Sequence, residues 1–273
     1  MSSKKLIVVI VPFADFKPEE KRAHQLKQFL THMTKLIKSA TSPVKMCIVV
    51  AEQNRPNCYF NRGQLLNAGV KWYVDHHTQP DFIIFHDVDM LPDKTLFSEY
   101  LKINGSISLV PQDIEYKKKY GRVVLSAGGG IFGISYIDFI AANGYPNGFF
   151  TWGGEDDAFG KRLEAVNRSN FIRVHKGHIT HIDSQRQSHK SKLEYLRKNK
   201  IRSMMVHENL AEDKLNWKSD GYNNIQYKPV DIFEVEGICV YIIKFNLDEK
   251  NLEKTIAHNN QVYKELSGGG TIA

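Results

Sequence analysis

The sequence predicts an α/β fold in which a mixed, Rossmann-like sheet is flanked by helices. Three apolar, β-branched runs begin at Leu6, Met46 and Phe82, and continuous runs of this kind are typical of strands that are covered on both faces. Helical patterns separate these runs, so strands and helices alternate along the chain. With 273 residues, of which 42% are apolar, the chain can bury a large core in one large domain or two closely joined ones.

The first strand is expected from Leu6 to Val11. Because Lys4 and Lys5 precede this run, a signal peptide is the alternative, but the run is short and Pro12 to Asp15 resembles a strand end rather than a cleavage site. The second strand is expected from Met46 to Ala51. The helix between the two strands has apolar side chains at helical spacing, namely Leu26, Phe29, Leu30, Met33, Leu36 and Ile37.

A second helix should begin close to the sheet edge. Residues 60 to 69 read Phe-Asn-Arg-Gly-Gln-Leu-Leu-Asn-Ala-Gly, and their second half has the pattern of an amphipathic helix. This pattern places Asn61 and Arg62 near the N-terminus of that helix. The alternative is that Arg62 is an ordinary surface charge.

The third strand, Phe82 to Phe85, leads into His86, Asp87, Val88 and Asp89. Acids separated by one residue point the same way in extended structure, so both can face one cation or one sugar nucleotide. In open α/β sheets, ligands bind at the carboxyl ends of the strands, where this pair lies. Such pairs also arise by chance, so the pair alone does not define a metal site.

Three consecutive carboxylates, Glu155, Asp156 and Asp157, follow the turn at Thr151 to Gly154. Adjacent glycines in that turn permit backbone conformations that other residues resist and allow a ligand to approach the main chain. The acids should open a helix, where the helix dipole stabilises them. An ordinary acidic helix start is the alternative.

The later elements follow from shorter patterns. Glycines at 128 to 130 resemble a phosphate cradle but lack its lysine and spacing, so close backbone packing or ligand approach is expected there. A polar loop is expected at 112 to 122. The other predictions are helices near 94–101 and 135–143, strands near 107–110, 171–174, 225–230 and 237–245, and a frayed tail at the C-terminus.

Two imidazoles, His178 and His181, follow the strand predicted at 171–174. Imidazoles three residues apart can share a metal, either from one helical turn or from an irregular loop. Plain surface histidines are the alternative. A metal site becomes the stronger reading if Asp87 and Asp89 supply oxygen ligands.

The formal charge of +7 indicates an anionic partner, which could be a nucleotide phosphate, an anionic lipid surface or a nucleic acid. Charge alone does not choose, but no nucleic-acid motif is present, so no nucleic-acid partner is expected. Much of the excess charge lies between residues 190 and 218, where a solvated helix face also explains it. The cations there are Lys190, Lys192, Arg197, Lys198, Lys200, Arg202, Lys214 and Lys218.

The cysteines and the apolar runs bear on the compartment. Cys47, Cys58 and Cys239 are too few and too scattered for a disulfide framework or a zinc-finger spacing, which favours a reducing compartment. Beyond the N-terminal run, no segment approaches the ~20 apolar residues that span a bilayer.

In combination and in this order, these stretches resemble the β-1,4-galactosyltransferase family, the metal-dependent inverting glycosyltransferases of GT-A fold. The resemblance implies a catalytic domain at 1–247, with a nucleotide-binding part at about 1–110 and an acceptor-binding part at about 111–247. A helical segment and flexible tail would follow at 248–273. The stretches that carry the resemblance are 8–13, 60–69, 85–92, 129–135, 143–163, 178–181 and 219–231, and the most specific motif is Trp-Gly-Gly-Glu-Asp-Asp at 152–157.

The resemblance implies how the donor nucleotide is held. Phe60 and Arg62 would hold the uridine diphosphate, and Asp87 and Val88 would line the same pocket. Ala127 aligns with the residue that gates the substituent at C2 of the donor sugar, and its small side chain would admit an N-acetyl group. UDP-galactose and UDP-N-acetylgalactosamine are therefore both expected donors.

The resemblance also implies a metal site formed by Asp89, His178 and His181. The family commonly has methionine at the position of His178. One carboxylate, two imidazoles and diphosphate oxygens suit Mn²⁺, and histidine in place of a thioether would widen tolerance towards Mg²⁺ or Co²⁺.

The acidic motif would complete the site. By the same resemblance, a mobile loop would close over both substrates, with Trp152 and Gly154 towards the donor and Gly153 towards the acceptor. Glu155 and Asp157 would grip acceptor hydroxyls, and Asp156 would be the catalytic base. The chemistry asks for such a base because the attacking hydroxyl must lose its proton opposite the departing diphosphate, and a single displacement gives a β-linked product.

Three departures from the family limit these expectations. Ala14 to Lys17 replaces an arginine-bearing stretch, so part of the donor contact differs. The segment between His181 and Ser219 is longer and lacks the recognisable acceptor-amide pocket, so the acceptor is a glycan or lipid-linked saccharide of open identity. Without an anchor in this sequence, a cytoplasmic enzyme of microbial type is expected, peripheral to the membrane through residues 190–218.

Two alternatives belong to different classes. One is a UDP-sugar transferase with another donor, from the N-acetylgalactosaminyl or xylose-acceptor branches. The other is a catalytically silent module that binds carbohydrate or nucleic acid. The intact acids and histidines argue against a silent module.

Overall fold

The computed structural model describes residues 4–15, 22–54, 59–109, 129–150, 154–182, 200–235, 239–249, 252–253 and 256–257, with the side chains of 200–206 excepted. A mixed sheet of eight strands forms its centre, in the order β7-β5-β6-β3-β1-β2-β10-β9. The strands of this sheet are β1 (Leu6–Phe13), β2 (Lys45–Gln53), β3 (Phe82–His86), β5 (Ile107–Ser108), β6 (Ile131–Ser135), β7 (Ile172–Arg173), β9 (Tyr227–Glu234) and β10 (Val240–Leu247). A second sheet pairs β4 (Met90–Pro92) with β8 (Ile179–His181).

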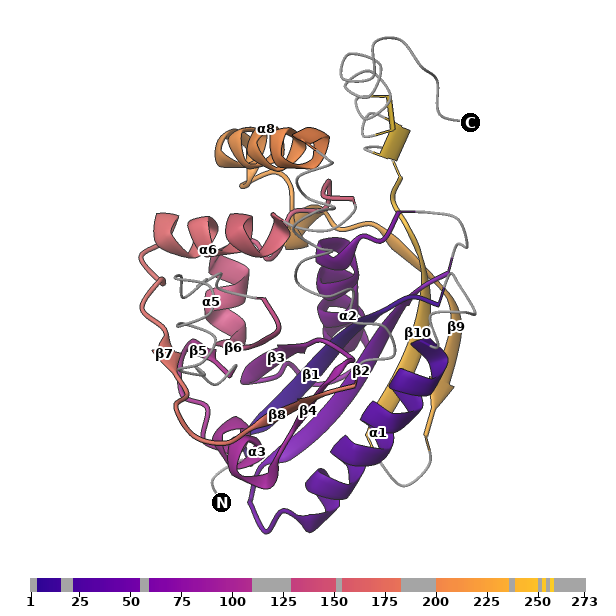
Figure 1. Cartoon of the computed structure of the whole chain (residues 1–273), viewed down its shortest axis with the longest axis vertical. Helices are drawn as coiled ribbons and strands as arrows, with labels where there is room; N and C mark the ends of the chain where they lie inside the picture. Colours follow the sequence, from indigo (N-terminus) through magenta and orange to yellow (C-terminus); the bar gives the residue numbers. More distant parts are fainter. Residues whose placement is uncertain are drawn as a thin grey trace.

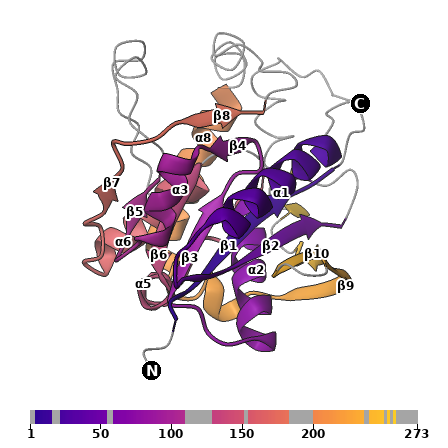
Figure 2. The same ribbon diagram turned by 90° about the horizontal axis from the view of Figure 1, so that it is seen from below.

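Helices cover both faces of the large sheet. They are α1 (Arg22–Ser39), α2 (Arg62–His76), α3 (Lys94–Leu101), α5 (Tyr136–Ala141), α6 (Glu155–Ala165) and α8 (Lys200–Asn216), with a short 3₁₀ turn, η2, at Tyr222–Asn224. Figure 2 shows α1 and α3 on one side of the sheet and α2 and α5 on the other. In Figure 1, α6 and α8 lie next to each other, beyond α5.

Successive side chains of β1 point to opposite faces of the sheet, and each face has its own apolar core. Val8 and Ile10 belong to the core under α2, together with Phe139 and Phe159 of α5 and α6. Val9 belongs to the core under α1 and α3. Because both faces of β1 are buried, its sequence is a continuous apolar run rather than an alternating one.

Four parallel strands end at one edge of the sheet. β1 runs parallel to β2 and β3, and β10 runs parallel to β2. Their carboxyl ends lead to Asp15, Asn54, Asp87 and Asp248, so polar side chains from distant parts of the sequence meet there.

The predicted α/β class and the alternation of strands and helices are confirmed, and the N-terminal run is the strand β1 rather than a leader. Some boundaries differ from the predictions. β5 and β7 are two residues long, whereas β9 and β10 run on to Glu234 and Leu247 because they pair with each other as an antiparallel ribbon. The loop predicted at 112–122 lies outside the described residues.

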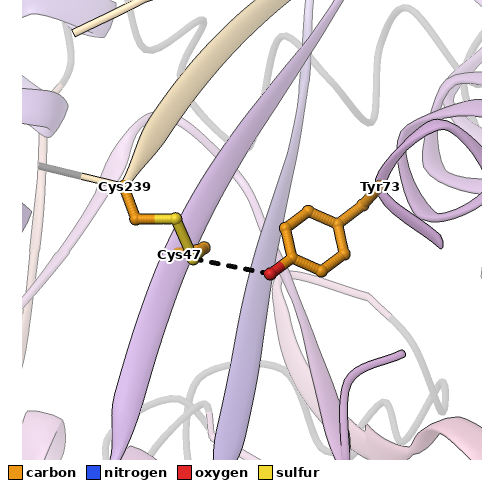
Figure 3. The surroundings of a disulfide bond; sticks show 3 residues. All are labelled: Cys47, Tyr73 and Cys239. Atoms are coloured by element: carbon orange, nitrogen blue, oxygen red, sulfur yellow. Dashed lines mark hydrogen bonds between the residues drawn. A yellow bond between two sulfur atoms is a disulfide. The ribbon is translucent and has the colours of Figure 1, made fainter. Parts of the chain in front are cut away.

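The structure contains one disulfide that the scattered cysteines did not predict. Cys47 of β2 and Cys239, next to β10, form a disulfide across a sequence separation of 192 (Figure 3). The Tyr73 hydroxyl of α2 donates to Cys47 Sγ at 3.6 Å. The two cysteines meet because β10 pairs in parallel with β2, a long-range contact that cysteine spacing does not reveal.

Across the part of the chain that the structure describes, no helix combines the length and the apolar character that a bilayer crossing requires.

Candidate active site

Arg62 is a buried cation at the carboxyl ends of the parallel strands. Asn61 caps α2 by accepting from the Gln64 amide at 2.9 Å, and this cap places Arg62 at the first helical position. Its Nε and Nη2 donate to Asp87 Oδ1 at 3.2 and 3.0 Å. Its Nη1 lies 3.8 Å from Glu155 Oε1, and only 9% of the residue is exposed. Arg62 is therefore part of a buried ion cluster and not a surface charge.

The surroundings of Arg62 keep it charged. Burial by itself would lower the pKa of the guanidinium, but Asp87, Tyr145 and Glu155 raise it above its ordinary value. The Tyr145 ring supports the cation from below, with its centroid 5.9 Å from the guanidinium carbon. A fixed positive charge at a sheet edge is suited to binding a phosphate.

The acidic turn lies across from Arg62. Gly154 precedes α6 with a φ of +95°, a left-handed conformation that favours glycine, and Glu155 to Asp157 form the first turn of α6. Glu155 is buried, Asp156 is half-buried and Asp157 is exposed. The three neighbouring acids thus have three different environments.

The environment of Glu155 favours the protonated form of its carboxyl. Burial raises its pKa to about 7, Arg62 opposes that rise, and Asp156 adds to it. Partial loss of solvent around its carboxyl, and then the charge of Asp156, also raise the pKa of Asp157, although the residue as a whole is exposed; Lys161 opposes them. A buried carboxyl that titrates near neutrality beside a fixed cation is typical of a functional site.

Asp87 and Asp89 flank the buried Val88 after β3. Burial raises the pKa of Asp89, Asp87 raises it further, and Arg22 and His181 lower it. His181 lies opposite Met90 in the β4–β8 ladder, and the Asp89 carbonyl accepts from the Ile182 amide at 2.7 Å. The structure therefore brings Asp89 and His181 together.

His178 lies at the other end of β8. Its carbonyl accepts from the Asp93 amide at 2.9 Å, which extends the β4–β8 ladder by one residue. Among the residues that the structure describes, no group of three or more His, Cys, Asp or Glu is placed to hold a metal.

The donors near Asp89 nevertheless fit a divalent cation of the manganese type. Asp87, Asp89 and His181 offer carboxylate oxygens and an imidazole, which such ions accept, and His181 is exposed and so can be reached. Arg62 already binds Asp87, which leaves Asp89 and His181 as the protein ligands that lie together, beside the predicted ligand His178.

His86 fixes the end of β3 and was not identified from the sequence. Its imidazole is buried, with Nδ1 2.9 Å from the Asp87 carbonyl and Nε2 3.0 Å from the Tyr100 hydroxyl. Burial lowers its pKa to about 4, so the ring stays neutral. Its position in front of the two acids was visible in the sequence, but nothing there showed its partners.

A buried amide network joins α2 to the turn before the acidic motif, and it too was not identified from the sequence. The Asn147 carbonyl accepts from Asn61 Nδ2 at 2.7 Å and from Gln64 Nε2 at 3.1 Å. Asn67 Nδ2 donates to Asn147 Oδ1 at 2.9 Å and to the Tyr145 carbonyl at 2.7 Å. The sequence signal was three amides at every third position across the start of α2.

The other predicted site residues are placed as follows. Phe60 is half-buried against the core under α2. Ala127, Trp152 and Gly153 lie outside the described residues, so the donor gate and the mobile loop stay predictions.

Comparisons with known proteins agree with this geometry. A family model described as the N-terminal region of glycosyl transferase group 7 matches residues 2–98, and one described as the N-terminal domain of galactosyltransferase matches residues 107–186. The chain is 28% identical to β-1,4-galactosyltransferase 7 of Drosophila melanogaster, over 89% of this chain and 69% of the relative. It is 25% identical to human β-1,4-galactosyltransferase 6, over 82% of this chain and 52% of the relative. It therefore spans about half the length of the human protein.

Solved structures give the same picture. The catalytic domain of Drosophila β-1,4-galactosyltransferase 7 in complex with xylobiose has a TM-score of 0.62 and 25% identity, covering 93% of this chain and 98% of that one. A mutant of the same protein in complex with manganese, UDP-Gal and xylobiose has a TM-score of 0.63 and 24% identity, with the same coverage. The fold is thus that of the GT-A galactosyltransferases. Because the two family models together match residues 2–98 and 107–186, the chain belongs to the group 7 galactosyltransferases.

Proposed function

We propose that this chain is a metal-dependent inverting glycosyltransferase, which moves galactose or N-acetylgalactosamine from a UDP-sugar to a hydroxyl of a saccharide acceptor. The observation that carries the proposal is the buried cluster of Arg62, Asp87 and Glu155 at the carboxyl ends of the parallel strands. It puts a fixed cation for the diphosphate next to the acids that would receive the acceptor.

Arg62 serves the donor end of the reaction. Negative charge builds on the diphosphate as it leaves the anomeric carbon, and a preorganised cation stabilises that charge without reorganisation. Asp87 holds the guanidinium through two hydrogen bonds, so its orientation is set before the donor binds. Mn²⁺ bound by Asp89 and His181 would act there as a Lewis acid on the same oxygens.

The acidic turn serves the acceptor end. Asp156 is half-buried at the start of α6, and its Oδ1 accepts from the Asp157 amide at 3.0 Å, which orients the carboxylate. As the general base, it would take the proton of the attacking hydroxyl on the face of the sugar opposite the diphosphate. Glu155 and the exposed Asp157 would bind acceptor hydroxyls on either side of this base.

We propose first the classes of the donor and the acceptor, and then a specific choice within each class. The Drosophila relative was solved with UDP-Gal and xylobiose, which supports a UDP-sugar donor and a glycan acceptor for this chain. The choice between galactose and N-acetylgalactosamine rests on the small side chain predicted at the donor gate. A lipid-linked acceptor, reached by contact of the basic residues 190–218 with an anionic membrane, is supported by the charge of that segment.

We propose the cytoplasm as the compartment. This proposal requires that Cys47 and Cys239 be reduced in the cell. Disulfides persist in oxidising compartments and are rare in the cytosol. Trapping free thiols by alkylation in intact cells therefore tests the location. Alkylated Cys47 and Cys239 would support the cytoplasm, whereas oxidised cysteines would place the protein in an oxidising compartment.

Calorimetry and product analysis together test the proposed activity. UDP should bind only when Mn²⁺ is present, and a radiolabelled UDP-sugar should yield a β-linked product with a saccharide acceptor. If UDP does not bind with or without Mn²⁺, the proposal is refuted. Manganese-dependent binding without transfer across a panel of donors and acceptors would instead indicate the silent binding module.

A further inference from the structure

Among the cations that the structure describes, Arg162 is the most buried, and it lies outside the cluster of Arg62, Asp87 and Glu155. It lies two turns along α6 from the acidic turn and is 1% exposed. Its Nε donates to Asp213 Oδ2 at 3.1 Å and its Nη2 donates to Asp213 Oδ1, so α6 is joined to α8 by a two-point ion pair. Burying a charged pair is costly, and the helices could pack through apolar residues instead.

The remaining donor of Arg162 reaches a different segment. Nη1 donates to the carbonyls of Asn143 and Gly144 at 3.2 and 3.0 Å, in the turn that precedes the acidic motif. Nη2 also lies 3.9 Å from Asp220 Oδ2. One guanidinium on α6 therefore contacts α8, the turn at 143–148 and the turn at 217–224. We call Arg162, Asp213, Asp220, Asn143 and Gly144 the Arg162 hub.

The two turns are locked together beside Arg162. Asn143 Nδ2 donates to the Trp217 carbonyl at 2.8 Å, and the Tyr222 amide donates to the Asn143 carbonyl at 2.8 Å. Gly221 allows this approach, because a Cβ at that position would lie 2.0 Å from the Asn143 oxygen and 2.7 Å from Arg162 Nη1. The space around the guanidinium is filled, so its position is determined.

A series of hydrogen bonds leads from the Arg162 hub to Arg62, the cation proposed to bind the diphosphate. Asp220 Oδ2 accepts from the Asn147 amide at 3.0 Å, and the Asn147 carbonyl accepts from Asn61 Nδ2 at 2.7 Å. Asn61 caps the helix that starts with Arg62. Hydrogen bonds and charge contacts thus run without interruption from Asp213 on α8 to the N-terminus of α2.

We propose that Arg162 is a positioning residue that sets the acidic turn of α6 against Arg62 and its donor pocket. This inference rests on the proposed function, since it assigns the relative placement of the base and the diphosphate cation to one buried ion pair. Arg162 touches neither substrate and acts through the turn at 143–148 and through α6. Small misplacements of catalytic groups cost rate far more than binding, so its loss should lower kcat rather than weaken UDP binding.

The decisive variant combines Arg162→Met with Asp213→Leu. Replacing both partners by apolar side chains of similar volume often preserves stability, whereas removing one leaves a buried charge without its partner. In the double variant, the carbonyls of Asn143 and Gly144 still lose their donor. Arg168→Met is the matched control, because Arg168 follows the same helix and its ion pair with Asp138, at 3.0 Å, lies at the surface.

Three readouts separate positioning from general support of the fold. In the double variant, kcat should fall by about tenfold or more, the Kd for UDP with Mn²⁺ should stay within about threefold, and amide hydrogen exchange at residues 155–158 should accelerate. Arg168→Met should change none of them. Arg162→Lys keeps a cation beside Asp213 but cannot donate to Asp213 and to the two carbonyls at once, so it serves as a second variant should the double variant fail to fold.

Two results would overturn the proposal. Parent-like kcat and parent-like exchange at 155–158 would show that the Arg162 hub positions nothing. A joint loss of UDP binding, kcat and thermal stability in Arg162→Lys would show a purely structural role. If the parent itself transfers no sugar, the proposed function fails, and the exchange measurement still decides whether Arg162 fixes the acidic turn.

Discussion

Replacing Glu155 by glutamine should stabilise the protein at alkaline pH. The carboxyl is 7% exposed, and its pKa is raised from the ordinary 4.5 to about 7, first by burial and then by Asp156, with Arg62 opposing. A raised folded-state pKa means that the folded protein binds the proton more tightly than the unfolded chain does. The stability from this group is therefore complete below pH 4.5 and is lost as the pH rises towards and through 7.

The size of the effect follows from the two pKa values. The gap between 4.5 and about 7 corresponds to about 3 kcal/mol of unfolding free energy above pH 8, most of which develops between pH 5 and pH 8. Glutamine is nearly isosteric and carries no titrating proton. The stability of Glu155→Gln relative to the parent should therefore rise by about 2 to 3 kcal/mol over that interval.

Urea unfolding at pH 5 and pH 8, without UDP or metal, measures the difference. Other titrating groups are common to both proteins and cancel in the comparison. Glu164→Gln, at an exposed position of the same helix, is the matched control and should show no such change. If the gap between Glu155→Gln and the parent is the same at both pH values, Glu155 ionises freely and the buried cluster is misread.

Three further predictions address the chemistry directly. Asp156→Asn should lower kcat by about 10²- to 10⁴-fold while sparing the binding of Mn²⁺ and UDP, because it removes the base alone; near-normal turnover would exclude Asp156 from the mechanism. Asp89→Ala and His181→Ala should abolish manganese-dependent UDP binding in metal titrations, whereas His178→Met should remain active with altered metal preference; an unchanged manganese requirement in the first two would refute the ligand set. UDP-N-acetylgalactosamine should be used at least as well as UDP-galactose when kcat/KM is compared with one acceptor, and a strong galactose preference would show that Ala127 does not gate the donor.

The sequence was sufficient for features that depend on local pattern. The buried strand ending at His86 predicted that Asp87 and Asp89 would lie at the sheet edge, and the helix start at Asn61 predicted the place of Arg62. Both were confirmed, because strand ends and helix caps are encoded in a few adjacent residues.

Features that depend on long-range packing could not be read in this way. Nothing local shows that Glu155 meets Arg62, since the contact requires α2 and α6, which share one core, to approach each other. Nothing in the local sequence distinguishes Arg162 from an ordinary helix charge, because its partner Asp213 lies 51 residues away. His178 and His181 have a spacing that suits several backbone conformations, and only the structure shows that His181 lies in a strand opposite Met90.

The disulfide divides the chain into a covalent ring and two open arms. The ring runs from Cys47 to Cys239 and contains α2, β3, α6 and α8, so Arg62 and Glu155 lie on the same closed loop. A single peptide-bond cleavage inside the ring leaves one covalent molecule until the disulfide is reduced. A cleavage between β1 and Cys47 instead leaves the arm that carries β1 without a covalent link, so that only noncovalent contacts hold it, including its pairing with β2 and β3. The same nick thus has opposite outcomes on the two sides of Cys47, and under non-reducing conditions a nicked ring would migrate as a single molecule.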